Sequence, residues 1–136
     1  IVCRDVSISY PGGVPTISLG IAYGASAFRG MFRPGQMGAS TECPEGQVAV
    51  GFTGFSGSLV DSLSMRCAPI VVTQGSTGLI FSRGTITTSE RVGGPDGSPI
   101  GNIDCPLGQF AGGALIRAGN NIDAFGLSCI RFGTAP

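Results

Sequence analysis

The chain of 136 residues contains no histidine, no lysine and no tryptophan, and its eight arginines balance eight acidic residues. Without histidine, neither a Ser-His-Asp nor a Cys-His catalytic arrangement can be built. Without a net positive charge or a basic cluster, the surface lacks the electrostatic footprint of a nucleic-acid-binding protein. We therefore expect a protein that is not an enzyme, needs no cofactor and has no nucleic-acid partner.

Long apolar runs and helix-forming segments are also missing. No apolar run reaches the roughly 18 residues typical of a membrane span, and no segment resembles a signal peptide. Since the sequence begins at Ile1 rather than at methionine, we expect a mature, processed chain without membrane insertion. With 24 glycines, nine prolines and few helix formers, the composition predicts an all-β fold of short strands joined by tight turns.

A repeat that is bracketed by cysteines organises the sequence. One copy runs from Cys43 to Cys67 and the other from Cys105 to Cys129. A repeat with a period of about 62 residues indicates that one supersecondary unit occurs more than once. Nine aligned positions are identical: both cysteines, Pro44/Pro106, Gly46/Gly108, Gln47/Gln109, Ala49/Ala111, Gly51/Gly113, Gly57/Gly119 and Asp61/Asp123.

The five cysteines predict disulfides rather than a metal site. The sequence has no Cys-x-x-Cys pair and no histidine, so a zinc site is not expected. The brackets predict the bridges Cys43 to Cys67 and Cys105 to Cys129, which place the protein in an oxidising, extracellular compartment. Cys3 is left over, either as a buried thiol or as a bridge to another chain.

Within each copy, apolar and polar residues alternate along two segments, which predicts two half-buried strands. Val50 and Phe52 share a face before the turn at Gly57, and Leu63 and Met65 share one after it. Each copy is therefore expected to be a strand, a tight turn and a returning strand.

Alternation before the first copy predicts a further strand over 17–23, and alternation between the two copies predicts strands over 70–72 and 79–81. One bracketed pair and about two intervening strands would make a four-stranded Greek-key unit. We expect a single domain over residues 1–136, with an incomplete first unit at 1–24, a unit at 25–67 whose following strands extend to 86, and a unit at 87–136.

A glycine-rich loop precedes each copy, over residues 34–41 and 93–99. Glycine lets the backbone approach a ligand closely, but it also simply makes turns, so the loops alone do not decide between these roles.

Inside each copy, Gly57-Ser-Leu-Val-Asp61 and Gly119-Asn-Asn-Ile-Asp123 resemble the Gly-x-x-x-Asp motif of jacalin-related lectins, and 93–99 resembles the Gly-Gly loop of that family. The Cys-Pro-x-Gly start of each copy and its closing cysteine resemble the outer vitelline membrane proteins of eggs, which share the fold. Together these similarities cover about half of the chain. They imply a β-prism, in which three Greek-key sheets surround a pseudo-threefold axis.

The resemblance also implies a ligand and its site. In jacalin-related lectins the sugar lies between the Gly-Gly loop and the Gly-x-x-x-Asp turn, without a metal. Asp61 and Asp123 would accept hydrogen bonds from the hydroxyls of a glycan, and amides of the turns would donate. The expected sites are Gly94, Asp96, Gly97, Gly119, Asn120, Asn121 and Asp123 for one, and Gly35, Gly38, Gly57, Ser58, Leu59 and Asp61 for the other. Phe55 is the aromatic residue nearest to the first turn.

Other roles stay open. Each aspartate could cap its own turn by accepting backbone amides. Two carboxylates could in principle hydrolyse a glycoside, but Asp61 and Asp123 occupy equivalent positions of different units and are expected to lie far apart. The chain could also be a self-assembling coat, matrix or filament protein, a homo-oligomer in which Cys3 or strands of a neighbour complete the first unit.

Overall fold

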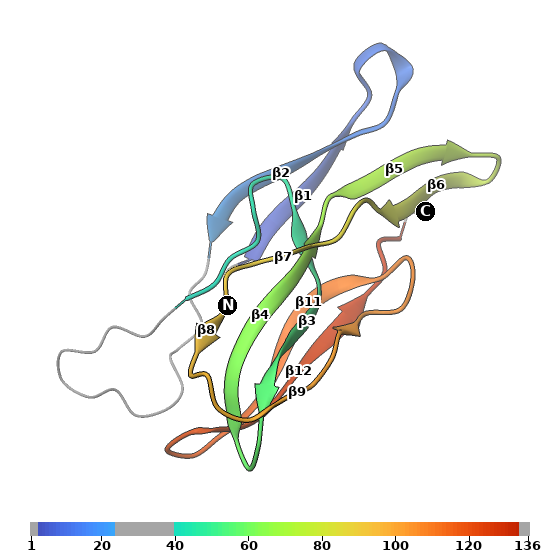
Figure 1. Cartoon of the computed structure of the whole chain (residues 1–136). Helices are drawn as coiled ribbons and strands as arrows, with labels where there is room; N and C mark the ends of the chain where they lie inside the picture. Colours follow the sequence, from blue (N-terminus) through green and yellow to red (C-terminus); the bar gives the residue numbers. More distant parts are fainter. Residues whose placement is uncertain (1–2, 24–39, 134–136) are drawn as a thin grey trace.

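A computed structural model describes residues 3–23 and 40–133, and it is built from strands (Figure 1). In these ranges there is one short 3₁₀ turn, η1 (Pro11–Gly13), and no α-helix. The prediction of an all-β fold is confirmed. The strands are β1 (Cys3–Ser9), β2 (Thr16–Tyr23), β3 (Val48–Ser56), β4 (Val60–Ala68), β5 (Ile70–Gly75), β6 (Gly78–Arg83), β7 (Thr87–Thr88), β8 (Val92–Gly93), β9 (Ser98–Pro99), β10 (Ile103–Asp104), β11 (Phe110–Ala118) and β12 (Ile122–Ile130).

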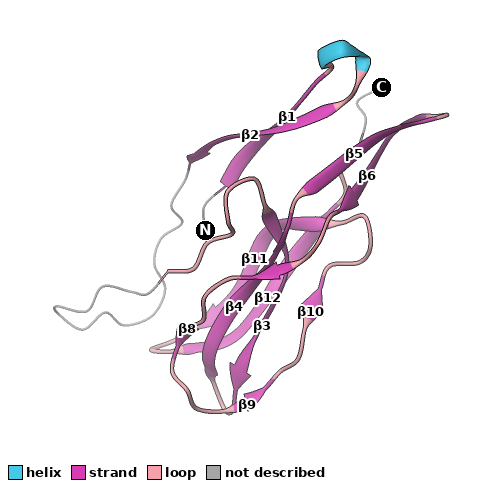
Figure 2. Ribbon diagram, turned by 45° about the horizontal axis from the view of Figure 1, so that its top comes forward, coloured by secondary structure: helices cyan, strands magenta, loops and turns pink. Residues whose placement is uncertain are grey.

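The long strands form four antiparallel hairpins, β1–β2, β3–β4, β5–β6 and β11–β12 (Figure 2). The strands predicted over 17–23, 70–72 and 79–81 lie within β2, β5 and β6, as the alternating pattern indicated. The hairpins β1–β2 and β5–β6 extend to one side of the molecule, away from the turns that join β3 to β4 and β11 to β12 (Figure 1).

The two cysteine-bracketed copies form the hairpins β3–β4 and β11–β12 in the same register. Ala49 pairs with Cys67, and at the equivalent positions of the second copy Ala111 pairs with Cys129. Both hairpins also have a register shift at the same place, directly after these alanines, and a second one before the turn. Each copy is thus a strand, a tight turn and a returning strand, as predicted.

A disulfide closes each of the two hairpins β3–β4 and β11–β12 at its base. Cys43 is bonded to Cys67 and Cys105 to Cys129, with Cα–Cα distances of 5.6 and 5.7 Å. Both predicted bridges are confirmed. Cys3 begins β1, and its side chain lies outside the described part of the structure.

Hairpin β3–β4 is the centre of a six-stranded sheet. The stretch 87–93 pairs with β4 through β7 and β8, and the stretch 98–104 pairs with β3 through β9 and β10. In chain order, β3 is strand 1, β4 is strand 2, the stretch 87–93 is strand 3 and the stretch 98–104 is strand 4. Across the sheet their spatial order is 4-1-2-3. The link between strands 3 and 4 therefore has to cross the turn end of the hairpin.

The core lies between the hairpins β3–β4 and β11–β12. Val50, Ala68 and Phe110 are buried and pack together, with the half-buried Phe132 against them. Nearer the turns, the rings of Phe52 and Phe125 meet edge to face at 4.9 Å between centroids. Such aromatic pairs stabilise a core beyond the area that they bury, so these rings fasten one hairpin onto the other.

The expected polar face of β4 is buried as well. Ser62 is 2% exposed and Ser64 is 6% exposed, although their alternation with Leu63 and Met65 predicted a half-buried strand. The reason is the position of β4 inside the sheet, with β3 on one side and β7 and β8 on the other. Serine side chains are small enough to be covered there.

Candidate functional site

The glycine loop at 93–97 lies against the turn of the first hairpin. The Gly94 amide donates a hydrogen bond to the Asp61 carbonyl oxygen at 2.8 Å. Just before it, Gly93 pairs with Ser62. The loop crosses the hairpin end because the strands that it joins lie on opposite edges of β3–β4. This strand order brings the loop and the Gly57 turn together although they are far apart in the sequence.

The close contact of loop and turn requires glycine at two positions. Gly93 and Gly97 have φ values of 111° and 82°, in the region that favours glycine. A β-carbon on Gly93 would overlap the Asp61 carbonyl oxygen, and one on Gly97 would overlap the Asp61 carboxylate. The loop can therefore approach Asp61 only because these side chains are absent.

The carboxylate of Asp61 is half-buried in this contact. Its Oδ2 atom lies 3.8 Å from where a β-carbon on Gly57 would stand. The turn closes through its own backbone, since the Gly57 amide donates to the Leu59 carbonyl oxygen at 3.0 Å. Among the described residues no hydrogen bond or ion pair engages the Asp61 side chain. The expected alternative, in which the carboxylate caps its own turn, is not what the structure has.

A second carboxylate, that of Asp96, belongs to the same loop. Its Oδ2 atom lies 4.0 Å from where a β-carbon on Gly94 would stand. That same position lies 3.9 Å from the Asp61 carbonyl oxygen. The loop and the turn thus contribute one acidic side chain each, and Ser58 in the turn is exposed.

The second turn has different surroundings. It closes in the same way, since the Gly119 amide donates to the Asn121 carbonyl oxygen at 3.0 Å. Asp123 lies 3.9 Å from the Arg117 guanidinium, and both side chains are exposed. A β-carbon on Gly119 would have open space around it. In the described ranges no glycine loop crosses this turn.

The structure therefore groups the predicted site residues differently from the sequence analysis. Gly94, Asp96 and Gly97 were expected beside the turn at 119–123, because the loop directly precedes the second copy. They lie instead at the turn at 57–61, because the outer strands return to the hairpin that precedes them. Gly35 and Gly38, expected at the first turn, fall outside the described residues.

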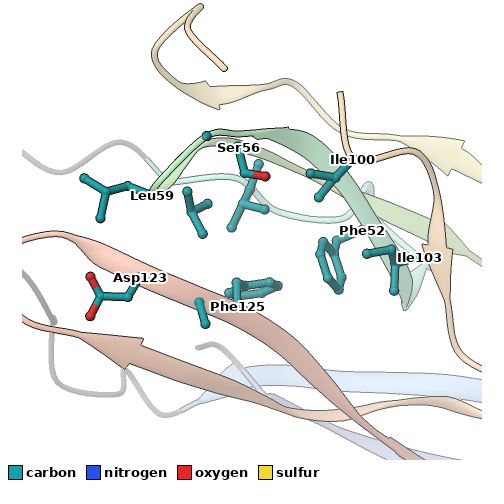
Figure 3. Close-up of a pocket in the computed structure, with 11 residues that line it drawn as sticks. Phe52, Ser56, Leu59, Ile100, Ile103, Asp123 and Phe125 are labelled. Carbon is teal, nitrogen blue, oxygen red and sulfur yellow. The ribbon is translucent and has the colours of Figure 1, made fainter. Parts of the chain in front are cut away.

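An apolar groove separates the two turns (Figure 3). Its volume is about 250 Å³. Leu59 and Asp123 lie at one end of it and Ile103 at the other. Both hairpins and the outer strand contribute its lining, namely Phe52, Ser56, Gly57, Leu59, Val60, Leu63, Ile100, Ile103, Asp123, Ala124 and Phe125. Gly57 and Leu59 of the first turn and Asp123, which follows the second turn, thus line the same groove.

Most of the residues that line this groove were not predicted to belong to a site. Phe52 was predicted only to share a face of a half-buried strand with Val50, and no role was predicted for Ile100 or Ile103. The alternation of apolar residues was the one signal that could have indicated their inward direction. That two hairpins would face each other here depends on tertiary packing, which no local pattern encodes.

Phe55, the aromatic residue nearest to the first turn, is partly covered. The Arg91 guanidinium lies 5.1 Å from the centre of its ring. This cation–π contact holds the stretch 87–93 against the hairpin. A ligand that stacked on the same face of Phe55 would have to displace Arg91.

Comparisons with known proteins found no match for this chain. No protein family matches the chain, and neither a curated protein nor a solved structure matches it. The described ranges hold no group of three or more potential metal ligands. They also hold no helix long and apolar enough to cross a membrane.

Proposed function

We propose that this chain is a secreted, non-catalytic carbohydrate-binding module of the β-prism kind, whose glycan lies at the glycine loop 93–97 and the turn 57–61. One observation carries the proposal: the Asp61 carboxylate lies between Gly57 and Gly97 without a hydrogen-bonding partner among the described residues. A half-buried acceptor next to the exposed residues Gly57 and Ser58 suits a ligand rich in hydroxyl groups.

The chemistry of this arrangement favours a sugar. A carboxylate can accept hydrogen bonds from two neighbouring hydroxyls, and such charge-assisted bonds are stronger than neutral ones. In this proposal the backbone amides at Ser58 and Leu59 donate to a ring or hydroxyl oxygen. Leu59 also begins the apolar groove, which offers a surface to the C–H face of a sugar. No metal is needed for these contacts.

The sheet order and the repeated register support the β-prism part of the proposal. The order 4-1-2-3 is that of a Greek key. The hairpins β3–β4 and β11–β12 share their pairing from one copy of the repeat to the next. Both are features that the lectin resemblance implies. The two disulfides support an extracellular location, since such bridges persist in oxidising compartments.

The test is glycan binding by three proteins. We would screen the parent chain on a glycan array and then measure its best ligand with Asp61→Asn and Asp123→Asn. The asparagine keeps the size of the side chain and removes its charge. Loss of a charged hydrogen bond costs roughly 1.5 to 3 kcal/mol, which corresponds to about 10- to 150-fold in Kd. Asp61→Asn should show this loss, and Asp123→Asn, whose carboxylate lines the groove but lies outside the contact of loop and turn, should show a smaller one. Failure of the parent to retain any glycan would refute the proposal.

Self-assembly is a second candidate function, because one specific observation favours it. Hairpin β11–β12 forms a two-stranded sheet whose outer edges pair with nothing else in the described ranges. This observation does not bear on the loop at 93–97, so assembly and glycan binding are compatible.

A further inference from the structure

The apolar groove is continuous with the contact of loop and turn (Figure 3). Gly57 and Leu59 of the turn line it, and so does Ser56, the residue directly before the turn. The loop reaches the same residue, since a β-carbon on Gly97 would stand 2.8 Å from the Ser56 carbonyl carbon. The loop, the turn and the groove therefore meet at one place, near the end of the groove at which Leu59 lies.

The chain that leaves the loop also lines the groove. Just beyond the loop, Ile100 contributes to the lining, and its amide donates a hydrogen bond to the Gly54 carbonyl oxygen at 3.0 Å. Further along, Ile103 pairs with Phe52 where β10 meets β3. Backbone pairing thus holds this segment along β3, from the loop to the far end of the groove.

The polarity of the groove changes along its length. The carboxylate of Asp123 lies at the same end as Leu59, next to the turns (Figure 3). Beyond this end the aromatic rings of Phe52 and Phe125 and the side chain of Ile103 provide an apolar lining. A molecule that follows the groove would therefore need a polar part next to the turns and an apolar part next to Ile103.

The size and the lining of the groove suit an alkyl chain better than a second sugar ring. Its volume is about 250 Å³, whereas an apolar cavity of about 150 Å³ is enough to hold benzene. Sugar hydroxyls placed against its apolar walls would lose hydrogen bonds to water without replacement, which costs free energy. An alkyl chain has no such cost, and it would cover Ile103, which is 47% exposed.

We propose that the ligand is an alkyl glycoside, in the chemical sense of a sugar whose anomeric oxygen carries an alkyl chain, and that the chain lies in the groove from Leu59 towards Ile103. This inference rests on the proposed function, because the sugar itself is held at the loop 93–97 and the turn 57–61. The loop and the turn then recognise the sugar, while the groove distinguishes glycosides of the same sugar by the length of their alkyl chain.

Calorimetric titration with two glycosides of one sugar tests this inference. The probes are the methyl and the hexyl glycoside of the sugar that the parent chain binds best, each below the concentration at which it forms micelles. A fully buried methylene strengthens binding about fourfold, and the hexyl glycoside has five more of them. Because a groove leaves one side of the chain in water, we expect the parent to bind the hexyl glycoside at least about tenfold more tightly.

Two variants change opposite walls of the groove away from the loop and the first turn. Ile103→Ser removes apolar surface at the far end, and Ala124→Leu fills the groove from β12, where Ala124 is exposed. Each should reduce the advantage of the hexyl glycoside to about threefold or less. Each should also leave the Kd of the methyl glycoside unchanged, which shows that the variant is folded. Ile80→Ser is the matched control, because Ile80 is 57% exposed on β6 and does not line the groove.

The outcomes separate this inference from the proposed function. Equal affinity of the parent for the two glycosides would overturn the role of the groove and leave the sugar site in place. The same conclusion would follow if both groove variants kept the hexyl advantage, or if Ile80→Ser lost it as well. Absence of binding by either glycoside would contradict the sugar site and the groove together. A hexyl advantage that Ile80→Ser keeps and both groove variants lose would support the inference.

Discussion

Gly97 lies directly against the carboxylate of Asp61, in a backbone conformation with a φ of 82°. One residue belongs to the link between the outer strands and the other follows the turn of the inner hairpin. Because a β-carbon on Gly97 would overlap the carboxylate, the path of the loop and the position of Asp61 determine each other. The proposed site exists only while this contact is kept.

Gly97→Ala should therefore destabilise the protein more than a positive φ alone explains. Gly101→Ala is the matched control, since Gly101 has a φ of 73° and open space around it. The control should cost about 1 to 2 kcal/mol, the penalty of a left-handed conformation. Gly97→Ala should cost at least about 1 kcal/mol more, because the carboxylate must also move. Urea denaturation of both variants measures the difference, and equal losses would contradict the close contact.

The ion pair between Arg66 and Asp104 should contribute measurably to stability. Two hydrogen bonds join the side chains, at 2.6 and 3.1 Å, and the side chains are 16% and 27% exposed. A paired, partly shielded contact of this kind should give a coupling energy of about 1 to 2 kcal/mol. A double-mutant cycle with Arg66→Met and Asp104→Asn measures it.

The control for that cycle is the pair of Arg117 and Asp123. Its atoms lie 3.9 Å apart and the Arg117 side chain is 80% exposed. Exposed pairs of this geometry contribute little, so the coupling energy should stay below about 0.5 kcal/mol. A coupling as large as that of Arg66 and Asp104 would show that burial does not distinguish the two pairs.

The two disulfides should stabilise the fold by similar amounts. Both close a loop with a sequence separation of 24 residues, so the unfolded chain loses the same conformational freedom from each. We expect a loss of about 3 kcal/mol for the double variant Cys43→Ala/Cys67→Ala and the same for Cys105→Ala/Cys129→Ala. Denaturation midpoints under oxidising conditions provide the comparison. A loss below about 1 kcal/mol for either would disprove the loop-entropy account of that bridge.

The hairpins and the disulfides could be predicted because their signals are local. Alternation of apolar residues marks each strand, and the cysteines bracket a single hairpin. The repeat then transfers each assignment to the second copy. Burial of Ser62 and Ser64 could not be predicted, because it depends on β4 lying inside a wider sheet.

The grouping of the site depended on strand order, which the sequence pattern does not contain. The loop with Gly94 and Gly97 directly precedes Cys105, so proximity in the sequence favoured the second turn. In space the loop follows the outer strands back to β3–β4 and contacts Asp61. The residues were thus identified from their types, while their assembly into one site required the fold.

The central claim is that a glycan binds at the loop 93–97 and the turn 57–61. Titration of isotope-labelled protein with the best array ligand, followed by amide chemical shifts, tests it most directly. We predict that the largest changes appear at Gly57, Gly94 and Gly97, with little change at Gly119. Shifts concentrated at the turn 119–123, or no shifts on saturation, would contradict the claim.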